Sequence, residues 1–253
     1  MKNRTLKSYT KQLSLLLPSR HKAKTGRPPL PKGLLVKEYM RMIKYGLGWR
    51  DIRHPSSVRR YISECQRRGC FKKVMQDMSG ERLDRRNKVS ITDACELQSW
   101  HVSKETPYSG KQKGYAAKIT LELTDDYKIR DIRFAKSYHH DIWEWEKMLE
   151  TKHLLPYVWY LDKGYFSLTI RKNLRKLNCQ VKTPPKEYKH RHAKGKKIQW
   201  GEKENKIRTR IERFFAWMQS FRKVRERRER QDALFHAHVY VAMTYYLYRR
   251  RVS

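Results

Sequence analysis

The stretch Tyr157-Val158-Trp159-Tyr160-Leu161-Asp162 is almost entirely apolar until its last residue, which is an acid. A short run of this kind, rich in aromatic and branched side chains, is typical of a central strand buried on both faces of a sheet. The sequence therefore predicts an α/β protein in which Asp162 stands at the end of an interior strand.

Three stretches before this strand alternate between apolar and polar residues. They cover residues 89–95, 115–123 and 129–134. Such alternation predicts strands, which we expect to form an antiparallel meander. Residues 141–152 then carry apolar side chains at helical spacing, so a helix is expected to lead into the strand at 157–162.

The chain after Asp162 continues the alternation of helices and strands. Ser167 is a candidate helix cap, 179–183 reads as a short strand, and long helices are expected from about 206 to 224 and about 231 to 249. The order is three strands, helix, strand, helix, strand, long helix. This is the order of a ribonuclease H-like core, with a mixed five-stranded sheet and helices, which we assign to residues 89–253.

The residues before this core divide into three parts. Residues 1–29 are basic and predict an N-terminal arm or a disordered tail, and the polar stretch 80–88 predicts a linker. Residues 30–79 predict a small all-α domain whose basic last helix, capped by Ser56, fits a helix-turn-helix. A plain three-helix bundle with a solvated basic face is the alternative.

Three acids stand out by their positions. Asp93 lies in the first strand, Asp162 ends the central strand, and Glu212 lies in the long late helix. Strands one and four are neighbours in a ribonuclease H-like sheet, and the late helix packs across their ends, so the three carboxylates are expected to converge. A lone acid at a strand end is more often structural. A cluster of carboxylates needs neutralising cations, and two Mg²⁺ ions, for which Mn²⁺ can substitute, would clamp an in-line displacement at phosphorus.

Arg208 lies four residues before Glu212 and therefore on the same face of the predicted helix. It is a candidate for orienting the carboxylate or binding a phosphate. A surface salt bridge is the alternative. Downstream of Asp93, Trp100 and His101 are candidates for stacking on or contacting DNA near the cut, with burial in the core the expected alternative for Trp100.

The charge balance indicates a polyanionic partner. The chain has 60 Lys and Arg against 25 Asp and Glu, a formal net charge of +35 spread over its length. This favours contact with nucleic acid along an extended surface, although a structural nucleic-acid protein or an anionic membrane would also fit the charge. No stretch is long and apolar enough to predict a membrane span. The candidate DNA-binding residues are Arg50, Arg59, Arg60, Arg67, Lys163, Arg208 and Arg213.

Several motifs resemble those of a known family. Residues 161–167 (LDKGYFS) and 211–217 (IERFFAW) are similar to the two acidic signatures of bacterial insertion-sequence transposases of the four/five superfamily, which are DDE transposases. Residues 137–141 (SYHHD), 43–52 (IKYGLGWRDI) and 221–230 resemble further segments of the same family. Together the motifs span residues 43–230.

The resemblance implies a DNA transposase whose metal-binding and catalytic triad is Asp93, Asp162 and Glu212. Such an enzyme binds the terminal inverted repeats of its element, cleaves double-stranded DNA there, and joins the ends to target DNA. A homodimer is expected because two ends must be brought together. The setting would be cytoplasmic and nucleoid-associated in a prokaryote, with a nuclear or viral setting left open. A domesticated or inactive DNA-binding relative, or a ribonuclease H-like nuclease without strand transfer, are the alternatives.

The chain departs from the family pattern in three places. Asp93 is followed by Ala-Cys instead of Gly-Ser or Gly-Thr, and Asp84 and Glu96 flank it as alternative ligands. Asn205 and Gln219 replace the Tyr and Lys that accompany the Arg and Glu of the late helix. The segment between the last strand and Glu212 is short, so no large insertion domain is expected there.

Overall fold

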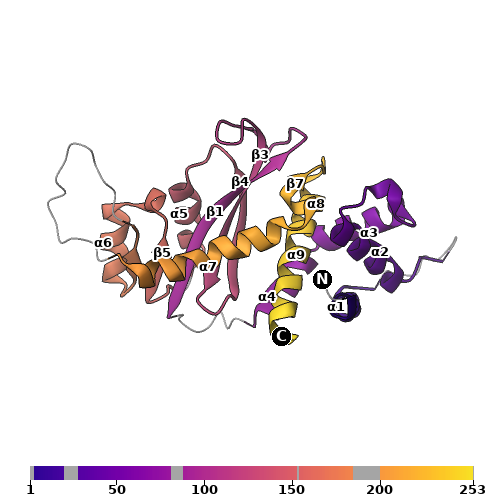
Figure 1. Ribbon diagram of the computed structural model, residues 1–253, viewed down its shortest axis with the longest axis horizontal. Helices are drawn as coiled ribbons and strands as arrows, with labels where there is room; N and C mark the ends of the chain where they lie inside the picture. Colours follow the sequence, from indigo (N-terminus) through magenta and orange to yellow (C-terminus); the bar gives the residue numbers. More distant parts are fainter. Residues whose placement is uncertain (1–2, 20–27, 81–87, 153, 185–199, 253) are drawn as a thin grey trace. The chain divides into compact units, whose positions relative to one another are not determined.

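The computed structural model describes residues 3–19, 28–80, 88–152, 154–184 and 200–252 (Figure 1). Their contacts divide the chain into two compact units. Unit 1 comprises residues 1–80, 97–103 and 217–253, and unit 2 comprises residues 81–96 and 104–216. The linker expected at 80–88 lies almost wholly outside the described residues, as does Asp84. No helix among the described residues is long and apolar enough to cross a membrane.

Unit 2 contains the predicted sheet. Its main strands are β1 (Val89–Ser99, whose last residues belong to unit 1), β3 (Gly114–Thr124), β4 (Ile129–Lys136), β5 (Val158–Leu161) and β6 (Gln180–Lys182). The strand order is β4-β3-β1-β5-β6, and the short β2 (Tyr108–Ser109) pairs antiparallel with the first two residues of β3. β3 and β4 are antiparallel, whereas β1, β5 and β6 run parallel to their neighbours in this half of the sheet. This mixed order confirms the ribonuclease H-like fold.

The helices of unit 2 follow the predicted order. They are α5 (Asp141–Glu150), the short η2 (Lys163–Tyr165), α6 (Leu168–Lys176) and α7 (Glu202–Gln219), the long helix that crosses the sheet in Figure 1. Ser167 caps α6, since its side chain accepts a hydrogen bond from the N–H of Ile170. α7 begins and ends earlier than the sequence predicted.

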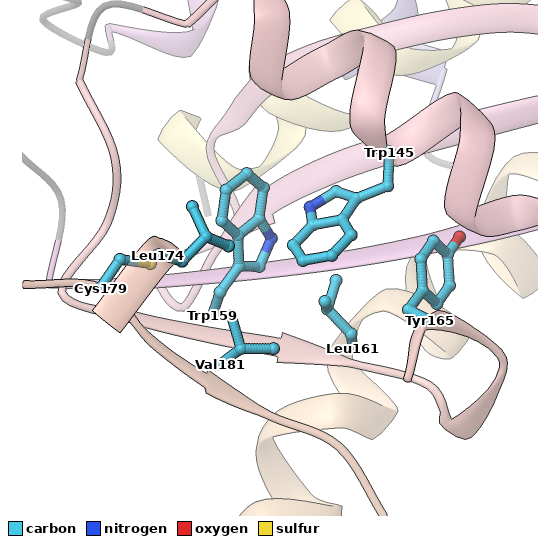
Figure 2. Close-up of a cluster of buried hydrophobic side chains, with 7 residues drawn as sticks. All are labelled: Trp145, Trp159, Leu161, Tyr165, Leu174, Cys179 and Val181. Atoms are coloured by element: carbon cyan, nitrogen blue, oxygen red, sulfur yellow. The ribbon is translucent and has the colours of Figure 1, made fainter. Parts of the chain in front are cut away.

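An aromatic cluster holds β5 against α5 and α6. Figure 2 shows the ring of Trp145 between those of Trp159 and Tyr165, and the ring centroids of the two tryptophans lie 5.4 Å apart at an interplanar angle of 88°. All three side chains are buried, and the Trp159 indole N–H donates to the Thr92 hydroxyl on β1 at 2.9 Å. Edge-to-face packing of this kind fixes the end of β5 at which Asp162 follows.

Unit 1 is helical. Its elements are α1 (Asn3–Leu16), α2 (Lys32–Tyr45), η1 (Trp49–Asp51), α3 (Pro55–Arg67), α4 (Cys70–Ser79), α8 (Arg222–Arg225), the two-residue strand β7 (Glu226–Arg227) and α9 (Asp232–Val252). α1, α3 and α4 all pack on α9, which is buried over most of its surface. The last helix therefore packs with the N-terminal helices, although the sequence had assigned it to the 89–253 domain.

Four local predictions in unit 1 need correction. The region expected to be a basic arm contains the helix α1, because Tyr9 and Leu13, one turn apart, are fully buried. α3 begins at Pro55 with His54 as its cap, so Ser56 lies inside the helix, and the separate helix α4 was not predicted. Trp100, expected in the core, is 58 % exposed and lies under the Arg228 guanidinium.

Candidate active site

Asp93 and Asp162 follow paired residues on two neighbouring parallel strands. The register of β1 and β5 pairs Thr92 with Leu161; Asp93 is the next residue of β1, and Asp162 directly follows the end of β5. Adjacent strands lie about 4.8 Å apart, and residues at the same register point to the same face. The sheet of unit 2 therefore brings these two carboxylates together at one edge.

Glu212 is connected to this edge through Arg208. Both residues lie on α7, and Arg208 Nη2 is 2.6 Å from Glu212 Oε1. Arg208 Nη1 also lies 3.9 Å from Asp162 Oδ1. Since the two carboxylates share one guanidinium, Glu212 and Asp162 belong to the same cluster. The side chains of Asp162 and Glu212 are 40 % and 45 % exposed, so both carboxylates remain open to a ligand.

Asp93 is the most buried of the three predicted acids. Burial, opposed by the hydrogen bond that it accepts from the Ala94 N–H at 2.8 Å, raises the pKa of Asp93 to about 6. The negative charge of Asp162 raises this pKa further, and the positive charge of Arg208 lowers it. A carboxyl whose pKa is raised by a neighbouring carboxylate is a group that a cation would return to its ionised form.

A fourth acid, Asp141, was not among the predicted site residues. Its Oδ1 atom lies 2.8 Å from the Nζ atom of Lys118, and a Cβ placed on Gly164 would be 3.9 Å from its Oδ2 atom. Its charge also contributes to the raised pKa of Asp93. Asp141 therefore lies beside the turn that follows Asp162. Asp141 is the last residue of the 137–141 motif that resembles the family, but the sequence around it does not reveal that Lys118 is its partner.

The alternative ligand Glu96 is otherwise occupied. Its Oε2 atom accepts a hydrogen bond from the Ser109 hydroxyl at 2.6 Å. This contact ties Glu96 to β2 instead of to the acids at the β1–β5 edge.

The donor set fits divalent metal ions, although the side chains are not arranged around one. Among the described residues, no three His, Cys, Asp or Glu side chains come close enough together to hold an ion. The Arg208 guanidinium stands instead between Asp162 and Glu212, and it is the positive charge that these two carboxylates share. All four acids offer only oxygen ligands, which is the set that Mg²⁺ and Mn²⁺ prefer.

The predicted DNA-binding residues fall in both units. Lys163 and Arg213 are exposed next to Asp162 and Glu212 in unit 2, whereas Arg208 is engaged with the acids. In unit 1, Arg50 is exposed on η1. The exposed face of α3 carries Arg59, Arg60 and Arg67, opposite its buried face.

Comparison with known proteins identifies a family. The sequence model described as "Transposase DDE domain" matches residues 84–247, which include all four acids. No curated protein sequence matches the chain.

Three solved structures match the chain at low structural similarity and low sequence identity. A piggyBac transposase synaptic complex with hairpin DNA has a TM-score of 0.45 and 10 % identity, and the match covers 66 % of this chain and 48 % of that one. The Mos1 strand transfer complex has a TM-score of 0.36 and 9 % identity, covering 91 % and 79 %. The Mos1 mariner paired end complex with Mn has a TM-score of 0.33 and 11 % identity, covering 75 % and 60 %. This chain thus spans about half the length of the piggyBac transposase chain that it matches.

Proposed function

Because the chain belongs to the transposase DDE domain family, we propose that it is an active DNA transposase of the insertion-sequence four/five type. It would bind the terminal inverted repeats of a mobile element, cleave the DNA there and transfer the strands to target DNA. The observation that carries this proposal is the β1–β5 register, which sets Asp93 beside Asp162, together with the guanidinium that Asp162 shares with Glu212.

The acids and the basic residues around them would have different roles. Asp93, Asp162 and Glu212 would hold two Mg²⁺ or Mn²⁺ ions, which when bound supply charge stabilisation for an in-line displacement at phosphorus. Lys163 and Arg213, exposed next to two of these acids, would hold DNA phosphates on either side of the reacting one. Asp141 is held by Lys118, so its negative charge is partly balanced before any ion binds.

The proposed partner is double-stranded DNA, and the net charge of +35 supports it. Neutralising such an excess with a polyanion releases counterions, so the affinity is expected to fall steeply as salt rises. The enzyme would act as a homodimer because the reaction joins two element ends. In a prokaryotic host it would work on the nucleoid.

An inactive DNA-binding relative and a nuclease without strand transfer make different predictions. The relative would bind DNA without cutting it, and the nuclease would cut without joining. The chain keeps all three acids of the triad, and two of them share Arg208, which favours an active enzyme over the first alternative.

The test is the reaction of end-labelled element DNA with a supercoiled target in Mg²⁺. We expect cleaved ends and joined products with the intact protein, and neither with Asp162→Asn. Asp125→Asn is the matched control, because Asp125 is exposed in the turn between β3 and β4. Cleavage without joined products would support the nuclease, and equal activity of Asp162→Asn and the intact protein would reject the site.

A further inference from the structure

Unit 1 contains an open hollow between α3 and the start of α9, here called the α3–α9 groove. On the α3 side it is lined by Ser56, Arg59, Arg60, Ser63 and Arg67, and it has a volume of about 540 Å³. Gln231 and Ala233, at the start of α9, form the opposite wall. None of these lining residues, all of them in the described part of the chain, is acidic.

The α3 side of the groove is a consequence of helical spacing. Ser56, Arg60, Ser63 and Arg67 recur at intervals of four, three and four residues, which places them in one stripe. Val58 and Ile62 point the other way into the core. The stripe therefore presents guanidinium and hydroxyl groups to solvent, and these are the donors that contact phosphate oxygens.

The arginines of the stripe are not neutralised by the protein. Within the described residues neither Arg60 nor Arg67 makes an ion pair, whereas Arg68, the residue that follows α3, has its Nη1 atom 3.7 Å from Glu64 Oε1. Both guanidinium groups therefore carry a charge that an anion in the groove could neutralise.

The opposite wall is also suited to an anion. α9 begins at Asp232, and the first turn of a helix carries partial positive charge on its free N–H groups. The Asp232 carboxylate would cancel that charge, but it is ion-paired with the buried Arg227 and accepts a hydrogen bond from the Ser103 hydroxyl at 2.8 Å. The positive end of α9 therefore adds to the arginines.

We propose that the α3–α9 groove seats backbone phosphates of duplex DNA, and this inference rests on the proposed function. Arg60 and Arg67 are seven residues apart, which is about 10 Å along a helix axis. The donor row is thus longer than a single phosphate group and matches a polymer of phosphates. The two walls of the groove come from distant parts of the sequence, since Arg67 and Gln231 are 164 residues apart.

The test measures binding of the full-length protein to a dye-labelled 30-base-pair duplex by fluorescence anisotropy at several salt concentrations. We expect Arg60→Gln and Arg67→Gln each to weaken binding about fivefold at 0.15 M salt and to lower the slope of log affinity against log salt by about one. Duplexes of two unrelated sequences should give the same result, because phosphates carry no sequence information. Arg68→Gln is the matched control, as it removes the same charge outside the groove.

A second pair of variants tests the α9 wall. Ala233→Glu should weaken binding by repelling phosphate, whereas Ala233→Gln, of similar size, should not. An acid in the first turn favours the helix, so a loss of binding by Ala233→Glu would not come from unfolding; circular dichroism melting curves check this.

If Arg60→Gln and Arg67→Gln bind as Arg68→Gln does, the groove is not a DNA site. If the two Ala233 variants bind equally, α9 takes no part.

Asp162→Asn separates this inference from the proposed function. It should lose cleavage while still binding DNA at least as tightly as the intact protein, because it removes a negative charge and leaves every arginine of the groove in place. If the groove variants bind DNA more weakly but the intact protein never cuts DNA, the groove proposal is supported and the transposase activity is rejected. If cleavage requires Asp162 but the groove variants bind DNA as the intact protein does, the transposase proposal is supported and the groove proposal is rejected.

Discussion

Arg208 and Glu212 lie one helical turn apart on α7, with Arg208 Nη2 2.6 Å from Glu212 Oε1. The second terminal nitrogen of the same guanidinium reaches towards Asp162, at 3.9 Å from its Oδ1 atom. A metal ion held by both acids would have to take the place of this guanidinium. Arg208 and the metal are therefore competitors for the same two carboxylates.

Replacing Arg208 should tighten metal binding in the absence of DNA. We expect Arg208→Gln to bind Mn²⁺ up to about fivefold more tightly than the intact protein, because a partly exposed ion pair contributes at most about 1 kcal/mol. Isothermal titration calorimetry with MnCl₂ measures this. Arg213→Gln is the matched control, because it removes the same charge from the residue next to Glu212. Equal affinities of the two variants would mean that only the overall charge matters.

The Lys118–Asp141 pair should show energetic coupling. Lys118→Met leaves Asp141 without its partner beside the other acids, and we expect this to lower the free energy of unfolding by about 1–2 kcal/mol after allowance for the partial exposure of Asp141. The double variant Lys118→Met, Asp141→Asn should be more stable than the sum of the two single changes predicts. Urea unfolding of all four proteins gives the coupling, and strictly additive effects would show that the contact contributes nothing.

Glu229 should make the stability of unit 1 depend on pH. It is buried, and the Trp49 indole N–H donates to its two oxygens at 2.9 and 3.0 Å. Burial alone would raise the pKa of Glu229, but His238, Trp49 and Lys223 together lower it to about 2, from 4.5. The stabilisation from a lowered carboxyl pKa is present above pH 4.5 and is lost as the pH falls towards 2.

We therefore expect Glu229→Gln to lower the melting temperature by roughly 5 °C at pH 7. The difference from the intact protein should shrink as the pH is lowered from 4.5 to 2. Thermal melts followed by circular dichroism in buffers across this range measure it. Glu64→Gln, which alters a half-exposed acid on α3, should change the melting temperature little at any of these pH values. A constant difference for Glu229→Gln across the range would contradict the lowered pKa.

Local patterns predicted the parts of the fold that local interactions determine. Residues 115–123 alternate, and β3 covers them. The apolar run before Asp162 became β5, because a strand between two neighbours needs apolar side chains on both faces. Arg208 and Glu212 were expected on one helix face from their spacing alone, and their contact confirms this.

Contacts between distant segments could not be predicted in the same way. Tyr9 is buried and its hydroxyl bonds to Thr244, and nothing within residues 1–17 reveals that partner. The contact between Arg208 and Asp162 depends on how α7 packs against the sheet. The Lys118–Asp141 ion pair depends on how α5 follows β4. α9 is apolar nearly all round its axis, which predicts burial but does not say which helices cover it.

The packing of α1, α3 and α4 on α9 sets an order of events during synthesis. Asp232, where α9 begins, is synthesised 153 residues after Ser79, where α4 ends. Until then the apolar faces of these first helices lack the surface that covers them, while the strands of the sheet are already available to pair. The sheet of unit 2 should therefore fold during synthesis before the helices of unit 1 are fully packed.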